Sequence, residues 1–161
     1  ARLYSEVDRG TRVSLFFPRK TVAPATDSRE IESFAPTGAG ETILVVEDDP
    51  DVRLITVSRL ENLGYRVRIA VDGPSALDAV RAHADIDLAL IDVVMPGGMD
   101  GHALADEIEK IAPRMRLVLT SGYSPRMAAL GAGTTRPFLA KPATRAQMAQ
   151  VVRNVLGATR R

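Results

Sequence analysis

The chain has 161 residues, enough for one domain with a proper core and an additional tail. Its 21 Lys and Arg nearly balance its 20 Asp and Glu, so its charge gives no reason to expect nucleic acid or membrane contact. The absence of Cys excludes disulfides and Cys-based zinc sites and is compatible with a reducing compartment; we expect a cytoplasmic domain.

No apolar run approaches the roughly 20 residues of a membrane span. No signal peptide is visible at the start, and the first residue is Ala, which is compatible with a piece of a longer protein.

Residues 1–19 predict a single β-strand. A Gly-Thr turn signal precedes residues 12–17, which alternate partly between apolar and polar side chains until Pro18 ends the run. A lone strand cannot bury its own face, so it needs a neighbouring sheet. Two other interpretations of these residues remain: an unstructured tail, or an extra edge strand of the main domain. Residues 20–41 are rich in Pro, Gly, Ala, Thr and Ser and predict a mobile linker, with a short helix around residues 28–34 as an option.

From residue 42 the pattern changes to five alternating strand and helix units. Strands are predicted at residues 43–46, 66–71, 88–92, 116–120 and 138–140, and helices at 50–63, from 76 onward, at 100–111, 124–130 and 144–156. Such alternation predicts a parallel sheet with helices on both faces. The fold class is therefore α/β, a flavodoxin-like doubly wound sheet of strand order 2-1-3-4-5, whose strands 1, 3, 4 and 5 end at one crevice.

Apolar spacing predicts which helix positions face the core. These are Val52, Ile55, Leu60 and Leu63 in the first helix, Leu104 and Ile108 in the third, and Met148, Val151, Val152 and Val155 in the last.

Side chains that can take part in chemistry or bind a metal ion lie at four predicted strand ends. They are Glu47, Asp48 and Asp49, then Asp92, then Thr120 and Ser121, then Lys141. Three carboxylates close together repel one another unless a cation sits among them, and hard oxygen ligands favour Mg²⁺ over zinc. Lys141 adds a positive charge and Thr120 a hydroxyl, while backbone N–H groups after Asp92 complete an anion cradle. The set is typical of attack by a carboxylate on phosphorus.

Each feature alone also has an ordinary structural explanation. Acidic residues before Pro50 suit a helix N-terminus, and a single Asp after a strand is commonly a turn residue. Four such features at four tips of one predicted sheet favour a site over coincidence. His83 and His102 fit structural or surface positions better than the role of a phosphodonor.

Residues 42–157 resemble the receiver domain of two-component response regulators. The matching motifs are ILVVEDDP, DLALIDVVMPGGMDG, LVLTSGY and PFLAKP, in that order. The resemblance implies that Asp92 is the phosphoacceptor. It also implies that Mg²⁺ is held directly by Asp48 and Asp92, by the Val94 carbonyl, and through water by Glu47, which stands where the family more often has Asp.

The same resemblance implies a switch and a phosphate partner. Thr120 is implied as the switch hydroxyl, Lys141 as the partner of a phosphate oxygen, and the bond to Pro142 as cis. Phe138 takes the place of an aromatic switch residue that is often Tyr, so without the hydroxyl its inward and outward positions would differ only in packing. Ser121 replaces a frequent Ala. The weak fourth helix and the GAGTTRP loop depart from the common pattern, so we expect an unusual output face.

The segment SEVDRGTRVSLFFPR looks like the last hairpin of the ATP-binding domain of sensor histidine kinases. The boxes that hold ATP are absent, so kinase activity is not expected of this segment. A kinase end at residues 1–19, a linker at 20–41 and a receiver at 42–161 form the order of a hybrid histidine kinase. Phosphate would reach Asp92 from a kinase His, in cis or in trans, and could pass to a His-bearing phosphotransfer protein.

Three rival interpretations stay open. The first is a free-standing response regulator whose N-terminal extension has its own role, for instance in pairing two copies into a homodimer. The second is an Asp-nucleophile phosphatase, which usually has a second Asp two residues after the nucleophile, where this chain has Val94. The third is a degenerate receiver that only binds partners, against which the intact acidic set, Thr120 and Lys141 argue.

Overall fold

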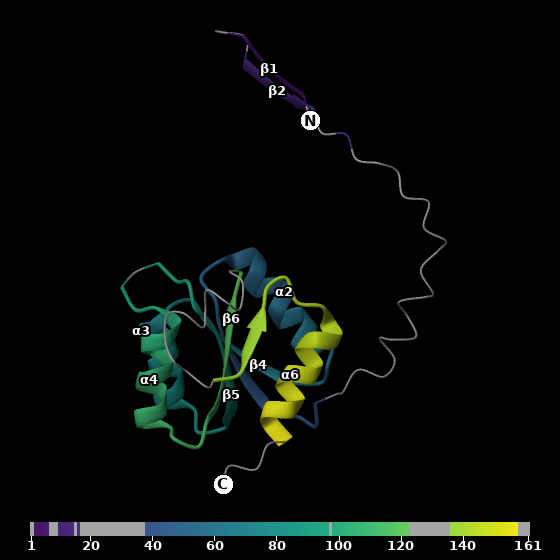
Figure 1. Cartoon of the computed structure of the whole chain (residues 1–161). Helices are drawn as coiled ribbons and strands as arrows, with labels where there is room; N and C mark the ends of the chain where they lie inside the picture. The colour runs from purple at the N-terminus through teal and green to yellow at the C-terminus, as the bar shows by residue number, and fades with distance from the viewer. Residues whose placement is uncertain are drawn as a thin grey trace, which may run out of the picture.

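In the described part of the chain, apolar runs form a five-stranded parallel sheet. The strands are β3 (Thr42–Val46), β4 (Arg66–Ala70), β5 (Ile86–Asp92), β6 (Arg116–Ser121) and β7 (Phe138–Ala140). Their order is β4-β3-β5-β6-β7, and each neighbouring pair is parallel. This is the flavodoxin-like order 2-1-3-4-5, so the predicted fold class is confirmed (Figure 1). The computed structural model describes residues 2–6, 10–14, 16, 38–96, 98–122 and 136–157.

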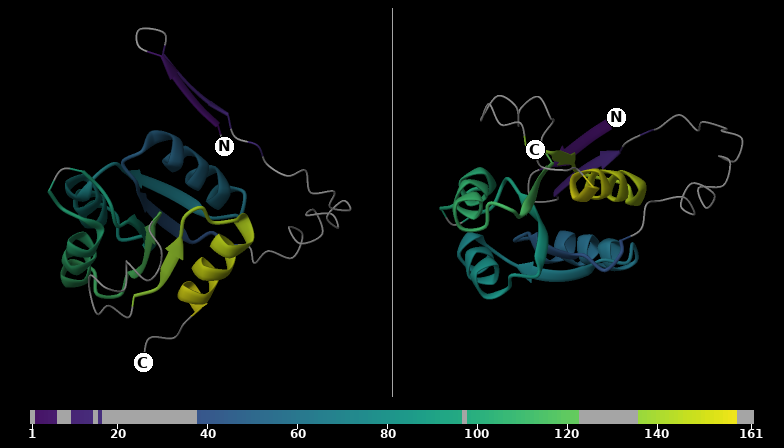
Figure 2. Two further views of the ribbon diagram at one scale, coloured as in Figure 1. Left: turned by 45° about the horizontal axis from the view of Figure 1, so that its top comes forward. Right: turned by 90° about the horizontal axis from the view of Figure 1, so that it is seen from below.

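Helices cover both faces of this sheet. One face carries α2 (Pro50–Glu61) and α6 (Arg145–Gly157), and the other carries α3 (Gly73–Ala82) and α4 (Gly101–Ile111), which lie side by side (Figures 1 and 2). Alternate residues of β3 point to opposite faces, so each face has its own core. Because β3 has no solvent side, its residues 43–46 are continuously apolar. Full burial of one Leu or Ile stabilises the fold by about 1.5–3 kcal/mol.

Apolar spacing identified most of the buried helix positions. Leu60, Leu63, Leu104 and Ile108 are fully buried, Met148 and Val152 are buried, and Val151 and Val155 are partly buried. The prediction for Ile55 is wrong, because its side chain is 52% exposed. Ile55 precedes Leu60 by five residues, which at about 100° per residue places it roughly 140° around α2 from the buried face.

Side-chain caps set where the helices begin. Asp49, Asp72 and Asp100 are the N-caps of α2, α3 and α4, and each accepts hydrogen bonds from backbone N–H groups of the first turn. Such a cap stabilises by about 1 kcal/mol. At the other end of α2, Gly64 has φ +87°, a conformation that favours Gly and turns the chain toward β4.

Four strand boundaries differ from the sequence prediction: β3 begins one residue earlier, at Thr42, β4 ends one residue earlier, at Ala70, and β5 and β6 are longer. β5 begins at Ile86 and not at Leu88, because the exposed Asp87 interrupts the apolar pattern without interrupting the strand. The Asp87 carboxylate accepts a hydrogen bond of 2.8 Å from the Thr42 backbone N–H. β6 extends to Ser121, which pairs with Ala140 of β7.

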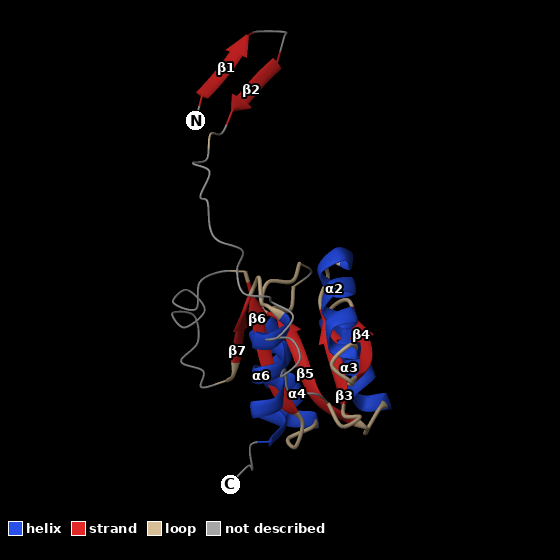
Figure 3. Cartoon of the chain, turned by 90° about the vertical axis from the view of Figure 1, so that its right-hand side faces the viewer, coloured by secondary structure: helices blue, strands red, loops and turns tan. Residues whose placement is uncertain are grey.

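The N-terminal segment holds two strands where the sequence predicted one. β1 (Arg2–Glu6) and β2 (Gly10–Ser14) pair antiparallel, with Leu3 opposite Val13 (Figure 3). The single-strand prediction is therefore corrected. β1 was missed because its two apolar side chains are adjacent and do not alternate with polar ones. Pairing supplies the backbone partners that a lone strand lacks.

Residues 38–41 contact the domain ahead of Thr42. The Gly38 N–H donates to the Leu63 carbonyl at 2.6 Å, and Arg153 forms an ion pair with Glu41. A Cβ on Gly38 would lie 2.6 Å from the Tyr65 ring, so this approach requires Gly. Residues 38–41, the end of the predicted linker, thus pack near the N-terminal ends of the strands, whereas the predicted crevice lies at their C-terminal ends.

Two predicted helices, at residues 28–34 and 124–130, lie outside the described residues. Within the described ranges, none of the helices has the length and apolar character needed to cross a membrane.

Candidate functional site

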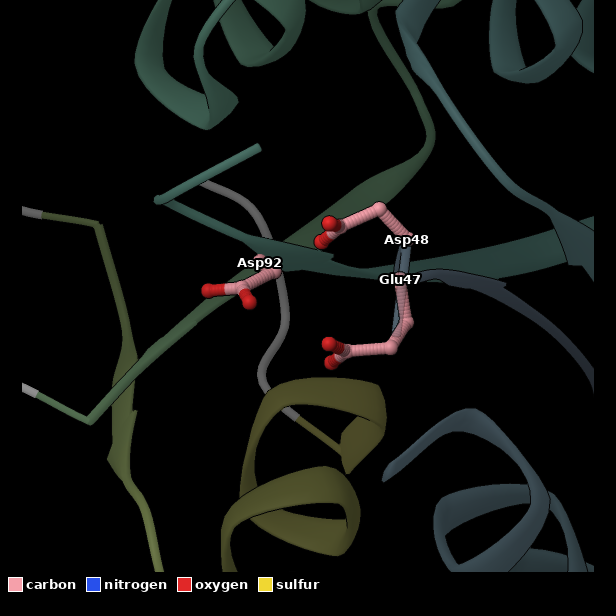
Figure 4. Close-up of side chains that lie close together, drawn as sticks. All are labelled: Glu47, Asp48 and Asp92. Atoms are coloured by element: carbon pink, nitrogen blue, oxygen red, sulfur yellow. The ribbon is translucent and has the colours of Figure 1, made fainter. Parts of the chain in front are cut away.

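Three carboxylates from two neighbouring strands meet at the C-terminal edge of the sheet. Glu47 and Asp48 follow β3, and Asp92 is the last residue of β5. Their carboxylate oxygens lie within 4.8 Å of one another (Figure 4). Glu47 and Asp92 are only 4% and 8% exposed, so water screens their charges poorly. The fourth predicted acid, Asp49, caps α2 instead.

Lys141, which follows β7, places its positive charge between two of these acids. Its ammonium donates to Glu47 and, over 2.8 Å, to Asp92. Burial lowers the pKa of Lys141, but its hydrogen bonds with Asp92 and Glu47 outweigh this effect, so the pKa is raised and the ammonium stays charged. Burial raises the pKa of Glu47; Lys141 opposes the rise and the Asp92 charge adds to it.

The cluster has the charge and donor set of a divalent cation site. With Glu47, Asp48, Asp92 and Lys141 ionised, its formal charge is −2, which one divalent cation would balance. The ligands on offer are hard carboxylate oxygens, which suit Mg²⁺. Mg²⁺ keeps several waters and needs only one or two direct carboxylates, so a cluster open to solvent at Asp48 fits its chemistry. The residues present therefore fit the predicted ion.

Thr120 lies beside Asp92 because β5 and β6 pair in parallel with these two residues in register. The Thr120 hydroxyl is buried and donates to the Ile91 carbonyl over 3.4 Å, a long bond. The Val93 N–H donates to the Thr120 carbonyl at 2.8 Å, so the backbones of the two strand ends remain joined past Asp92.

Backbone groups complete the surroundings of Asp92. The Val94 N–H donates to a carboxylate oxygen of Asp92 at 3.2 Å, while the Val94 side chain is exposed. The Lys141 N–H donates to the Ser121 carbonyl at 2.8 Å, and the Lys141–Pro142 peptide bond is cis. The chain at the end of β7 is thereby held against the end of β6, with the Lys141 side chain directed to the carboxylates.

Phe138 lies on the same pair of strands as Thr120. It pairs with Leu119 in the β6–β7 register, and its partly buried ring packs against the core under α3 and α4. Leu119 directly precedes Thr120 in β6, so Phe138 and Thr120 occupy register positions one residue apart.

Two residues that support the cluster could not be predicted from the sequence. The Arg53 guanidinium donates to the backbone carbonyls of Glu47 and Asp48. The backbone of Gly101 lies so close to that of Asp92 that an added Cβ would stand 2.2 Å from the Asp92 carbonyl oxygen. Neither residue carries a pattern of its own: an Arg in a first helical turn and a Gly after an N-cap are common, and only the contacts reveal them.

A groove of about 440 Å³ runs from the cluster between α2 and α6. Its polar end is formed by Glu47, Thr120 and Lys141, and its sides are largely apolar, including Val52, Ile55, Pro142 and Met148. Ile55 and the neighbouring Leu54 are exposed beside it. The carboxyl end of the sheet is therefore approachable along apolar side chains of α2.

Comparison with known proteins identifies similar domains. Residues 43–153 match the family model for the response regulator receiver domain. The structure is similar to that of the response regulator protein TrrA of Thermotoga maritima in complex with Mg²⁺ and BeF, with a TM-score of 0.64, 27% identity, and coverage of 71% of this chain and 98% of that one. It is also similar in fold to the chemotaxis protein CheY4 of Vibrio cholerae, with a TM-score of 0.64, 24% identity, and coverage of 73% of this chain and 99% of that one.

Curated relatives include both kinases and regulators. The sensor kinase CckA of Brucella abortus is 33% identical over 162 residues, which cover 94% of this chain and 17% of CckA. The response regulator receiver protein CpdR of the same organism is 37% identical over 82 residues, which cover 51% of this chain and 67% of CpdR. The chain spans less than half the length of the first four curated relatives.

Proposed function

Because the chain belongs to the response regulator receiver domain family of two-component signalling, we propose that Asp92 is its phosphoacceptor. The observation that carries the proposal is the position of this carboxylate. It is nearly buried, bonded to Lys141, and within 4.8 Å of two further carboxylates. An ordinary turn residue has no such surroundings, whereas a nucleophile beside a cation site requires them.

The proposed reaction takes a phosphoryl group from a phosphohistidine of a histidine kinase. A carboxylate oxygen of Asp92 attacks phosphorus, the new P–O bond forms, and the P–N bond breaks. The leaving imidazole nitrogen keeps the bonding electron pair and takes up a proton. Lys141 then pairs with a phosphoryl oxygen, and the Val94 N–H, which already donates to the Asp92 carboxylate, donates to another.

We propose Mg²⁺ as the cofactor, held by Asp48, Asp92 and the Val94 carbonyl, with Glu47 bound through water. When bound, Mg²⁺ neutralises charge on the phosphoryl oxygens. The cluster alone carries a formal charge of −2 and would repel an anionic donor, so the chain's own residues need the cation before Asp92 can react.

The proposed output is a switch at Thr120 and Phe138. The long bond from the Thr120 hydroxyl to the Ile91 carbonyl is weak, so the hydroxyl can turn toward a phosphoryl group on Asp92 at small cost. Phe138 lies on the strand paired with that of Thr120, one register position away, and carries no hydroxyl. The response of its ring would therefore be a change of packing under α3 and α4.

We further propose that the chain is a segment of a hybrid histidine kinase. The similarity to CckA supports this, because it extends over 94% of the chain and hence beyond the receiver. In this proposal residues 1–19 close a kinase ATP-binding domain, residues 20–41 form a tether, and 42–161 form the receiver. The antiparallel pairing of β1 and β2 agrees with a terminal hairpin. A His-bearing phosphotransfer protein would receive the phosphoryl group.

A free-standing regulator is the second candidate, because CpdR matches over 67% of its own length. The coding sequence upstream of residue 1 would distinguish the hybrid kinase from the free-standing regulator. A histidine kinase core there would support the hybrid architecture, and a start codon close by would support the free-standing regulator.

The experiment that tests the phosphoacceptor is intact-protein mass spectrometry after mixing with Mg²⁺ and a small phosphodonor, with Asp92→Asn alongside. The gain of one phosphoryl group in the wild type alone is expected. Equal gain in both proteins, or no gain in a folded wild type with either a small donor or a phosphorylated kinase, would refute the proposal.

A further inference from the structure

Arg53 holds the backbone of the two adjacent acids of the cluster. It lies in the first turn of α2, and its guanidinium nitrogen Nη1 donates to the Glu47 carbonyl at 2.7 Å and to the Asp48 carbonyl at 3.0 Å. One charged side chain thus satisfies two consecutive carbonyls at the point where β3 has ended. Hydrogen bonds from a charged donor are stronger than those between neutral groups.

This contact bears on a geometric problem of the site. Consecutive side chains of a strand point to opposite faces, yet Glu47 and Asp48 both place carboxylate oxygens in the same cluster with Asp92 (Figure 4). The backbone must therefore leave strand geometry directly after Glu47. The last hydrogen bond between β3 and the β4 side runs from the Glu47 N–H to the Ala70 carbonyl at 3.2 Å. Beyond this bond, the Arg53 guanidinium donates to the carbonyls of Glu47 and Asp48.

We infer that Arg53 is a positioning residue for the cation site, acting through the backbone of Glu47 and Asp48. The inference rests on the proposed function, since it concerns the Mg²⁺ that the acidic cluster would hold. Without these two hydrogen bonds, the turn after β3 relaxes and the two carboxylates no longer share one side. Outer contacts that orient ligands in this way typically contribute 10–100-fold to metal affinity.

The direction in which Mg²⁺ affinity changes when Arg53 is removed distinguishes a positioning role from a simple charge effect. Arg53 is positive and lies near a cation site, so Coulomb repulsion alone predicts that its removal tightens Mg²⁺ binding. Positioning predicts the opposite, weaker binding. The two explanations therefore cannot be confused in one measurement of affinity.

The test is Mg²⁺ titration by calorimetry of the wild type, Arg53→Met and Arg81→Met. Arg81→Met is the matched control, because it removes the same charge from an exposed ion pair with Asp78 on α3. We expect the Mg²⁺ dissociation constant of Arg53→Met to rise about tenfold and that of Arg81→Met to stay unchanged. In the metal-free protein, the amide resonances of residues 47–49 should shift only in Arg53→Met.

Equal or tighter Mg²⁺ binding by folded Arg53→Met would overturn the inference, as would equal weakening in Arg81→Met. If Arg53→Met does not fold, Arg53→Gln is measured in its place, because its shorter side chain does not span both carbonyls, and it is judged by the same criterion. A wild type that fails to bind Mg²⁺ contradicts the proposed function itself, whereas equal binding by wild type and variant contradicts only the role of Arg53.

Discussion

Replacing Gly101 with Ala tests how the structure holds Asp92, the proposed phosphoacceptor, in place. Gly101 begins α4, and its N–H donates to the Val93 carbonyl at 3.0 Å. An added Cβ would lie 2.2 Å from the Asp92 carbonyl oxygen and 2.7 Å from the Val93 Cα. Both are backbone atoms, so no side-chain rotation can relieve the contact, and either α4 or the end of β5 must move.

The size of the effect follows from two opposing contributions. Ordinary contact begins near 3.4 Å, so the required displacement is about 1 Å. Such overpacking costs about 1–3 kcal/mol of unfolding free energy. Replacing Gly by Ala in a helix contributes at most about 1 kcal/mol in the other direction. We therefore expect Gly101→Ala to lose about 1–2 kcal/mol and, since sites tolerate displacements of only about 0.5 Å, to be phosphorylated on Asp92 at least tenfold more slowly.

Urea denaturation and phosphorylation kinetics with a small donor measure the two effects. Gly157→Ala is the matched control, because Gly157 ends α6 and an added Cβ there meets nothing within 4 Å. We expect this control to equal or slightly exceed the wild type in stability and to react at the same rate. A Gly101→Ala protein as stable and as reactive as the control would refute the reasoning.

Three further variants test the site itself. Asp92→Asn should abolish phosphorylation and keep the wild-type circular dichroism spectrum, and unchanged labelling would contradict the assignment. Lys141→Ala should retain some phosphorylation and lose the shifts of β6 and β7 amide resonances that follow it, so a wild-type response would contradict its role. The pKa of Glu47 is raised, so its stabilising contribution is complete below the unfolded value of 4.5 and is lost as pH rises through the folded pKa. Without Mg²⁺, the stability of Glu47→Gln relative to wild type should therefore increase as the pH rises above 4.5 in urea titrations, and a constant difference would argue against this.

The local pattern of apolar and polar residues was sufficient to predict the sheet and the polar residues at the C-terminal ends of its strands. Runs such as residues 43–46 are apolar throughout because helices cover both faces, and alternation with helices leaves few ways to order parallel strands. The ends of those strands then place Glu47, Asp92, Thr120 and Lys141 at one edge, whatever the details of packing. Local pattern failed at β1, whose strand character comes from its pairing with β2.

By itself, the sequence determined the fold class, the strand order and which polar residues gather at the carboxyl edge, because these depend on the period of apolar residues and on chain connectivity. Only the tertiary structure decided how those residues are held. The ion pair of Lys141 with Glu47 joins residues 94 positions apart, and the approach of Gly101 to Asp92 depends on how α4 docks on β5. Such contacts are products of packing between distant segments, and no local spacing encodes them.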